Sequence, residues 1–179
     1  MSGARTPAIL LLDANVVIHL FRCGIWARFV RQCEVHLAQT VVEEADYFED
    51  EDDNRITIDL TDDVATGDVT VFEIAGPDLQ TFRDRYDPSY AERLDPGETE
   101  SLAYLLRNVG SGFRICSSDS IVFRILGNLS MSDAGVSLEE ALKEVGLGRP
   151  LPYQFTGAFR KRWSARGFQN GLGGIGSTE

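Results

Sequence analysis

The stretch ILLLDANVVI, at residues 9–18, places a single charge, Asp13, inside an apolar run. The apolar residues before Asp13 are typical of a central parallel strand that is covered on both faces. The residues after it predict a helix from Ala14 to Phe21. An unpaired carboxylate is costly to remove from water. An acid at this strand–helix junction therefore needs a partner or a function.

The rest of the chain continues the alternation of strands and helices. Strands are predicted at residues 56–60, 69–74 and 113–116, and helices at residues 25–31, 40–48, 78–86, 98–108, 120–126 and 137–146. This order predicts an α/β layer fold around a mostly parallel sheet. We expect one domain over residues 1–150, followed by a basic and aromatic segment, 151–179, that ends in a flexible glycine-rich tail.

Composition and charge limit the classes of protein to which this chain can belong. The chain has 179 residues, of which 43% are apolar, and no apolar run is long enough for a membrane span. The short apolar run near the N-terminus is unlike a secretory signal, so we expect a cytoplasmic protein. The net charge is −11, but residues 41–100 hold 20 acidic and 4 basic residues. The acidity is therefore local, with a peak at residues 49–53 that is typical of a solvated loop.

Two aspartates come after predicted strands, Asp13 directly and Asp119 a few residues later, just before a helix. Ligands of open parallel sheets bind beyond the carboxyl ends of the strands. Asp13 follows the first strand and Asp119 follows the strand at 113–116, so both side chains are expected at that edge. Each could also serve only as the N-cap of the helix that follows it.

Helical geometry predicts which glutamates lie near the buried face of their helix and which point to solvent. With about 100° per residue, Glu98 falls near the apolar stripe of its helix, and Glu44 falls on the flank of its own. Glu43 and Glu100 fall on the opposite side, toward solvent. Asp13, Glu44, Glu98 and Asp119 are thus four acids at borders between core and surface. The negative charges of these acids repel one another unless they share a cation. Hard oxygen ligands of this kind suit Mg²⁺ or Mn²⁺.

With these acids in place, the chain resembles the PIN-domain nucleases, particularly the VapC-like toxins. The matching segments are LLDANVVI (Asp13), TVVEEADYF (Glu44), LDPGETESLAYLL (Glu98) and ICSSDSIVFRIL (Asp119), and they span residues 8–146. Many members have Thr-Asp-Asp or Thr-x-Asp where this chain has Ser117-Ser118-Asp119. The acidic insert between Glu44 and Glu98 is also long.

The resemblance implies a Rossmann-like α/β/α fold and Mg²⁺- or Mn²⁺-dependent cleavage of single-stranded RNA. It also implies neutralisation by a cognate antitoxin and, by default, a homodimer. The four acids would be the catalytic residues and would hold one or two ions, which activate a water for attack on the phosphorus. Asn15 could hydrogen-bond a ligand carboxylate or be an ordinary first-turn residue, and Ser117 could orient water or substrate.

RNA requires positive charge, and single strands also bind by base stacking. The candidate RNA contacts are Arg22, Arg28, Arg160, Arg162 and Trp163. The last three could equally belong to an amphipathic terminal helix that packs on the domain.

Two rival functions remain. A haloacid-dehalogenase phosphatase requires a second aspartate two residues after the first, where this chain has Asn15, and a basic partner in a chain with only two lysines. A catalytically inactive PIN-like module that binds RNA or protein is the stronger alternative.

Overall fold

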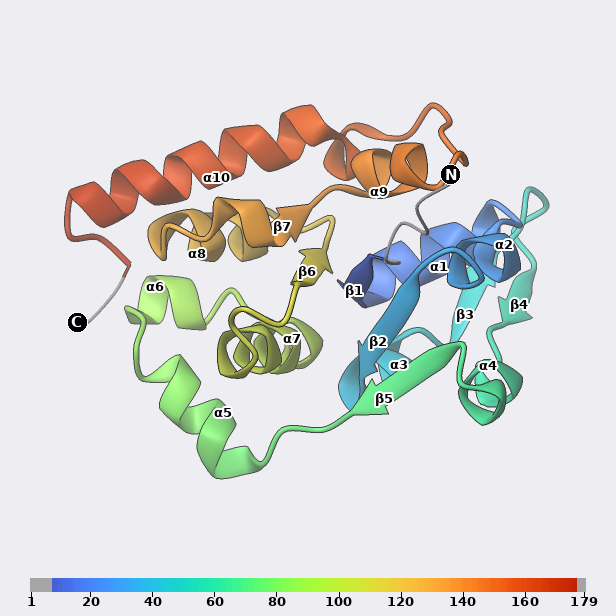
Figure 1. Cartoon of the computed structure of the whole chain (residues 1–179), viewed down its shortest axis with the longest axis horizontal. Coiled ribbons are helices and arrows are strands. Elements are labelled where there is room, and N and C mark those ends of the chain that lie inside the picture. Colours follow the sequence, from blue (N-terminus) through green and yellow to red (C-terminus); the bar gives the residue numbers. More distant parts are fainter. Residues whose placement is uncertain (1–7, 177–179) are drawn as a thin grey trace, which may run out of the picture.

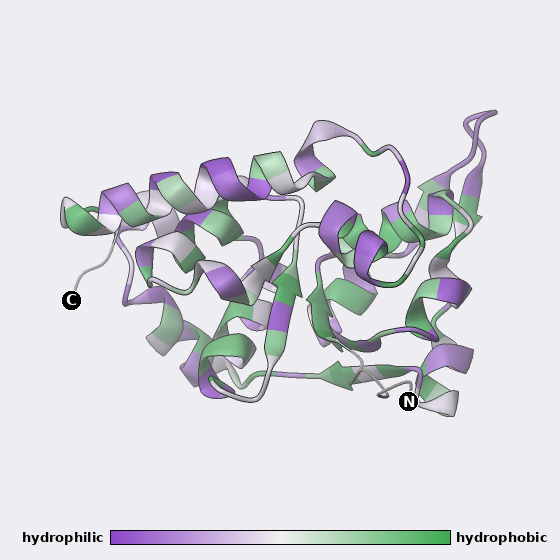
Figure 2. Cartoon of the chain, turned by 45° about the horizontal axis from the view of Figure 1, so that its top comes forward, coloured by the Kyte–Doolittle hydropathy of each residue, from purple (hydrophilic) through white to green (hydrophobic). Residues whose placement is uncertain are grey.

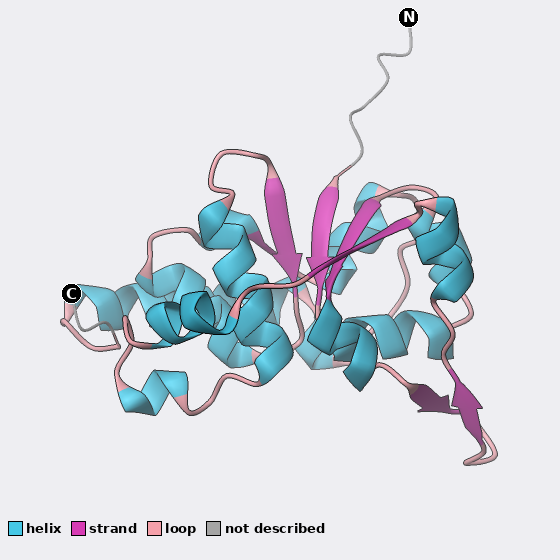
Figure 3. Cartoon of the chain, turned by 90° about the horizontal axis from the view of Figure 1, so that it is seen from below, coloured by secondary structure: helices cyan, strands magenta, loops and turns pink. Residues whose placement is uncertain are grey.

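The computed structural model describes residues 8–176, and a five-stranded sheet lies at its centre (Figure 1). The strand order is β5-β2-β1-β6-β7, and every neighbouring pair is parallel. The strands are β1 (Ile9–Leu12), β2 (Glu34–Ala38), β5 (Val69–Phe72), β6 (Phe113–Cys116) and β7 (Gly135–Val136). Helices flank the sheet (Figure 3), which confirms the predicted α/β fold of Rossmann-like α/β/α architecture.

The apolar run in β1 is continuous because both of its faces are buried. Leu10 and Leu12 belong to one core cluster and Leu11 to the other, as the alternation of side chains along a strand requires. The first cluster includes residues from α1 (Ala14–Arg22), α2 (Trp26–Val30) and α9 (Leu138–Glu144). The second includes residues from α5 (Gly76–Arg83), α7 (Pro96–Arg107) and α8 (Ser120–Asn128).

An antiparallel hairpin interrupts the α/β pattern after α3 (Gln39–Glu44). It consists of β3 (Tyr47–Glu49) and β4 (Arg55–Thr57), and α4 (Thr61–Thr66) follows it. The acidic residues 49–53 lie at its hydrophilic tip, which projects from the body of the molecule (Figure 2). In this turn, the Asp50 carboxylate accepts hydrogen bonds from the N–H groups of Asp52 and Asn54, both at 2.9 Å.

The C-terminal helix α10 (Gly157–Leu172) lies across α8 (Figure 1). Glycines bring the two backbones together: a Cβ atom at Gly167 would lie 1.9 Å from the Arg124 carbonyl oxygen, and one at Gly127 2.0 Å from that of Ser164. The predicted boundary at residue 150 stays a prediction. None of the helices within residues 8–176 is long and apolar enough to cross a membrane.

The tail was expected to be flexible, yet its described part is held by hydrogen bonds. The Asn128 side chain donates to the Ile175 carbonyl at 2.8 Å, and the Gly176 N–H donates to Asp87, just before α6 (Pro88–Ala91), at 2.7 Å. Residues 177–179 lie outside the described part.

Several predicted boundaries differ from the structure, and one strand was missed. The helix predicted over 40–48 ends at Glu44, because the next residues turn into the β3–β4 hairpin. The helix predicted to stop before Gly127 continues to Asn128, because Gly127 packs against α10. No element was predicted for β2, which lies between β1 and β5.

The topology fixes where a ligand can bind. The chain leaves β1 for β2 on one side and returns to β6 on the other, so the strand order reverses at β1 and β6. Crevices at such a reversal, beyond the carboxyl ends of the strands, are the usual ligand sites of open α/β sheets. Asp13 and Ser117 follow these two strands directly, and the Asp13 N–H donates to the Cys116 carbonyl at 3.2 Å.

Candidate active site

Acidic side chains from three segments line one cavity of about 220 Å³ beside the end of β1. Asp13 comes from the β1–α1 junction, Glu44 from the end of α3, and Asp95 and Glu98 from the start of α7. The remaining lining residues are Ala14, Asn15, Ile18 and Val41, so no basic side chain lines this cavity. Asp119 lines a larger cavity, of about 470 Å³, that shares Asn15 and Ile18 with the first. The structure thus gathers three of the four predicted acids in one cavity and places the fourth at the adjoining one.

Asp13 is the most firmly held of these acids, and its side chain is buried, with 6% exposed. One carboxylate oxygen accepts the Val16 N–H at 2.6 Å, which makes Asp13 the N-cap of α1. The other oxygen accepts the Ser117 hydroxyl at 2.7 Å and the Ser118 N–H at 2.8 Å. Burial raises the pKa of Asp13, and these hydrogen bonds oppose the rise. Asp13 is therefore both a cap and a lining residue of the cavity.

Glu98 points inward, as its position on the helix predicts, and only 5% of it is exposed. It forms a capping box with Asp95: Asp95 accepts the Glu98 N–H at 2.7 Å, and Glu98 accepts the Asp95 N–H at 3.2 Å. Burial, followed by the charges of Asp95 and Asp119, raises the pKa of Glu98 to about 9. This carboxyl group consequently holds a proton at neutral pH.

Asp95 is a lining acid that the sequence prediction missed. It lies in the segment LDPGETESLAYLL, in which only Glu98 was predicted to be a site residue. The available signal was the spacing of Asp95 and Glu98, which is that of an N-cap and its N3 partner. Burial raises the pKa of Asp95, and the charge of Asp119 adds to this rise.

Glu44 reaches the cavity from the last turn of α3. Partial burial and the charge of Asp95 raise the pKa of its carboxylate, whereas a hydrogen bond from the Gly97 N–H lowers it. A Cβ atom at Gly97 would lie 2.9 Å from Val41 Cγ2 and 3.1 Å from Glu44 Oε2. Glycine at this position therefore allows the start of α7 to approach Glu44 closely.

Asp119 is connected to Asp13 through Ser117. The Ser117 hydroxyl donates to Asp13 and accepts the Asp119 N–H at 2.9 Å. Asp119 in turn caps α8 by accepting the Ile121 N–H at 2.9 Å. Both aspartates thus cap helices, and both also line cavities. Asn15 is exposed, lines both cavities and has no hydrogen bond to a carboxylate within the described residues.

The donor chemistry suits a hard divalent cation. Five carboxylates lie at the two joined cavities, the pKa values of Asp13, Glu44, Asp95 and Glu98 are raised, and no basic residue lines the smaller cavity. As arranged, no three His, Cys, Asp or Glu side chains within residues 8–176 are placed to hold one ion together. The capping box helps to keep two of these carboxylates apart from a shared ion, because Glu98 and Asp95 each accept a backbone hydrogen bond from the other. These side chains would have to turn toward a shared ion.

Glu100 contradicts the prediction that it points to solvent, since only 2% of it is exposed. Its carboxylate accepts the Thr40 hydroxyl and the Ile74 N–H, both at 2.7 Å. It therefore connects α7 to the start of α3 and to the segment after β5.

The candidate RNA contacts occupy different environments. Arg22 lines the larger cavity beside Asp119, and Arg28 is exposed on α2, outside both cavities. Arg160 forms a bidentate ion pair with Glu140, at 2.7 and 2.8 Å. Burial raises the pKa of the Glu140 carboxylate, but hydrogen bonds from Arg160 and Ser137 outweigh this and lower the pKa to about 2. Arg160 therefore has a structural role at the start of α10.

Arg162 and Trp163 lie together on α10, where they line a surface hollow with Ala165, Arg166 and Gln169. The Arg162 guanidinium lies 5.4 Å from the centre of the Trp163 ring. This surface is basic, but none of its residues lines either cavity that holds the acids.

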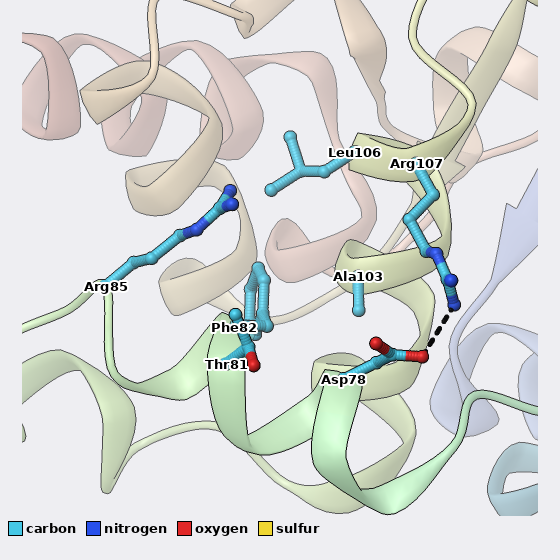
Figure 4. Close-up of a pocket in the computed structure, with 7 residues that line it drawn as sticks. All are labelled: Asp78, Thr81, Phe82, Arg85, Ala103, Leu106 and Arg107. Atoms are coloured by element: carbon cyan, nitrogen blue, oxygen red, sulfur yellow. Dashed lines mark hydrogen bonds and ion pairs between the residues drawn. The ribbon is translucent and has the colours of Figure 1, made fainter.

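A further cavity, of about 230 Å³, lies between α5 and α7 (Figure 4). Its floor includes the buried Phe82, and the Arg85 side chain reaches across toward Leu106. Asp78, the only acid that lines it, is paired with Arg107 at 3.1 Å. It contains no group of acids or nucleophiles comparable to the first site.

No protein-family model, no curated protein and no solved structure matches the chain. The function must therefore be inferred from the site itself.

Proposed function

We propose that the protein is a PIN-like, Mg²⁺- or Mn²⁺-dependent endoribonuclease that hydrolyses phosphodiester bonds of single-stranded RNA. The observation that carries the proposal is the cavity at the β1–β6 reversal, which is lined by Asp13, Glu44, Asp95 and Glu98 and by no basic residue. A site that gathers negative charge without a protein counter-ion suits a bound cation.

The residues that would hold the cation are Asp13, Glu44 and Glu98, with Asp119 beside them. Asp95 joins this set, because it lines the same cavity and raises the pKa of both Glu44 and Glu98. When bound, the ion would supply activation of a water molecule and neutralisation of charge on the phosphate. No Ser-His-Asp or Cys-His set lines the cavity, which suits hydrolysis by water.

Hydrogen bonds within the protein position the acidic side chains, and one of these side chains carries a proton. The three hydrogen bonds to Asp13 hold its carboxylate in one orientation at the end of β1. Ser117 keeps the Asp119 loop at a fixed place relative to Asp13. Glu98 retains a proton at neutral pH, and it would release this proton when a positive charge enters the cavity. Binding of the cation would thus be tighter at higher pH.

The choice of RNA as substrate, and a toxin role with an antitoxin and a homodimer, derive from the resemblance of the four segments to the PIN-domain nucleases. The alternative is a PIN-like module that binds RNA or a protein without cutting. Substitution of Glu44, with substitution of Glu43 as its control, distinguishes the nuclease from the non-cutting module.

Glu44→Gln is expected to lower metal-dependent cleavage of single-stranded RNA by about a hundredfold, because it removes one charge from the cavity. Its matched control is Glu43→Gln on the same helix, where the side chain is exposed. The control should stay within about twofold of the wild type. Cleavage of a 5′-labelled RNA, and of DNA of the same sequence, is measured with Mn²⁺, with Mg²⁺ and with EDTA.

Absence of any metal-dependent cleavage by the folded wild-type protein would favour the non-cutting module. Equal loss in both variants would mean that the cavity is not the active site. Cleavage of DNA alone would contradict the proposed substrate.

A further inference from the structure

The larger cavity beside the acids has the composition of a nucleotide subsite. One face of α1 forms its floor through Asn15, Ile18, His19 and Arg22, which recur at helical spacing. The opposite wall consists of Ser118 and Asp119 before α8 and of Pro152, Gln154 and Phe155 before α10. We refer to this cavity, of about 470 Å³, as the polar groove.

The polar groove adjoins the cavity that the acids line. Asn15 and Ile18 line both, so a strand whose phosphate lies beside Asp13 could continue into the groove. Asn15 and Arg22 are seven positions apart, which is about 10 Å along the helix axis. Arg22 therefore lies at a distance from the acids at which it could meet a neighbouring phosphate rather than the one that is cut.

Four polar side chains in the polar groove have no partner within the described part of the chain. Within residues 8–176, the side chains of Asn15, Arg22, Ser118 and Gln154 form no hydrogen bond or ion pair. Arg160 at the start of α10, by contrast, is engaged in an ion pair with Glu140. Unengaged donors and acceptors that converge on one groove are the groups a polar ligand requires.

Between these polar groups the wall is apolar and aromatic. The His19 ring lies against that of Phe155, with 4.4 Å between the ring centres, and Ile18 and Pro152 extend this surface. Burial lowers the pKa of His19, and the charges of Arg22 and Arg149 add to this effect. The imidazole is therefore neutral at neutral pH. A flat ligand with apolar faces and polar edges fits such a wall, and a nucleobase is one.

We propose that the polar groove holds the nucleotide next to the cleaved bond, with Arg22 on its phosphate and the amides of Asn15 and Gln154 on the edge of its base. This rests on the proposed function, because the cleaved bond is assumed to lie at Asp13. Among the described residues, Arg22 is the only arginine or lysine that lines either cavity, so it also offsets the repulsion between the acids and the RNA backbone. Gln154 would set a preference for particular bases.

Binding without cleavage tests the proposal. Fluorescein-labelled pentanucleotides of adenosine, cytidine or uridine are titrated with the full chain in EDTA, and anisotropy is recorded at several salt concentrations. Arg22→Ala should weaken binding of all three by roughly tenfold, as expected for the loss of a charged hydrogen bond. It should also reduce the slope of log K against log salt by about 0.7. Arg93→Ala, at an exposed position after α6 that lines neither cavity, is the matched control and should leave both unchanged.

Gln154→Ala tests the base contact separately. It should reduce the difference in affinity among the three oligonucleotides by roughly tenfold, while the salt dependence stays the same. The control is Gln32→Ala, an exposed glutamine that lines neither cavity.

Three outcomes would overturn the proposal: no RNA binding by the wild type, unchanged binding by Arg22→Ala, or loss of binding only with Arg162→Ala on α10. The outcomes are independent of the nuclease assay. Glu44-dependent cleavage combined with a neutral Arg22→Ala would refute the groove and leave the nuclease. Arg22-dependent binding without any cleavage would refute the nuclease and leave RNA binding in the groove.

Discussion

Asp13→Asn is expected to abolish metal-dependent cleavage, with a loss of about a thousandfold or more. The substitution removes one charge from the cavity and also breaks a hydrogen-bond arrangement. Both Asp13 oxygens act as acceptors, and one of them receives the Ser117 hydroxyl and the Ser118 N–H. An asparagine amide can accept with one atom only, so its NH₂ group would face the N–H of either Val16 or Ser118, whichever way the amide is turned.

The same substitution should lower the free energy of unfolding by about 1–3 kcal/mol, the usual effect of leaving a buried donor unsatisfied. Cleavage rate and urea denaturation are therefore measured together, so that loss of activity can be separated from loss of structure. The matched control is Asp62→Asn, at an exposed position on α4, which should change neither. Undiminished cleavage by a folded Asp13→Asn protein would remove Asp13 from the mechanism.

Glu98→Gln is expected to stabilise the protein in the absence of divalent ions. The pKa of Glu98 rises from 4.5 to about 9 on folding, so the folded state binds more protons than the unfolded state between these values. Stability from this group is complete below pH 4.5 and is lost as pH rises toward 9. Glutamine keeps the side-chain oxygen that accepts the Asp95 N–H and has no charge to bury.

The advantage of the variant should therefore be absent below pH 4.5 and grow through neutral pH. It should reach the order of 3 kcal/mol near pH 7. Urea denaturation at pH 4, 7 and 9 measures this, and Mg²⁺ should stabilise the wild type more than the variant. Glu92→Gln, at an exposed site after α6, is the control and should show no such trend. A difference that does not vary with pH would contradict the inward, desolvated placement of Glu98.

The sequence was most informative where local signals and burial agree. Strand β1 was predicted because a strand covered on both faces leaves a continuous apolar pattern. β2 carries Glu34 and His36, which hydrogen-bond to each other at 2.9 Å. These polar residues obscure its pattern, and its pairing with β1 and β5 depends on distant segments.

The inward direction of Glu98 followed from helical geometry, but the same reasoning misplaced Glu100. A helical projection assigns one buried face, whereas the first half of α7 is buried all round, from Gly97 to Ala103. The donors that satisfy Glu100, from Thr40 and Ile74, come from segments 60 and 26 residues away. The convergence of Asp95 with the other acids is equally a product of tertiary structure, as is the engagement of Arg160 by Glu140.

The most direct test of the shared cation is a crystal structure of the full chain grown with Mn²⁺, with data collected for the anomalous signal of manganese. We predict one or two anomalous peaks in the acidic cavity, coordinated by Asp13 and by carboxylates among Glu44, Asp95, Glu98 and Asp119 at about 2.0–2.2 Å. Saturating Mn²⁺ that leaves this cavity without a peak, in a protein that still cleaves RNA, would contradict the account.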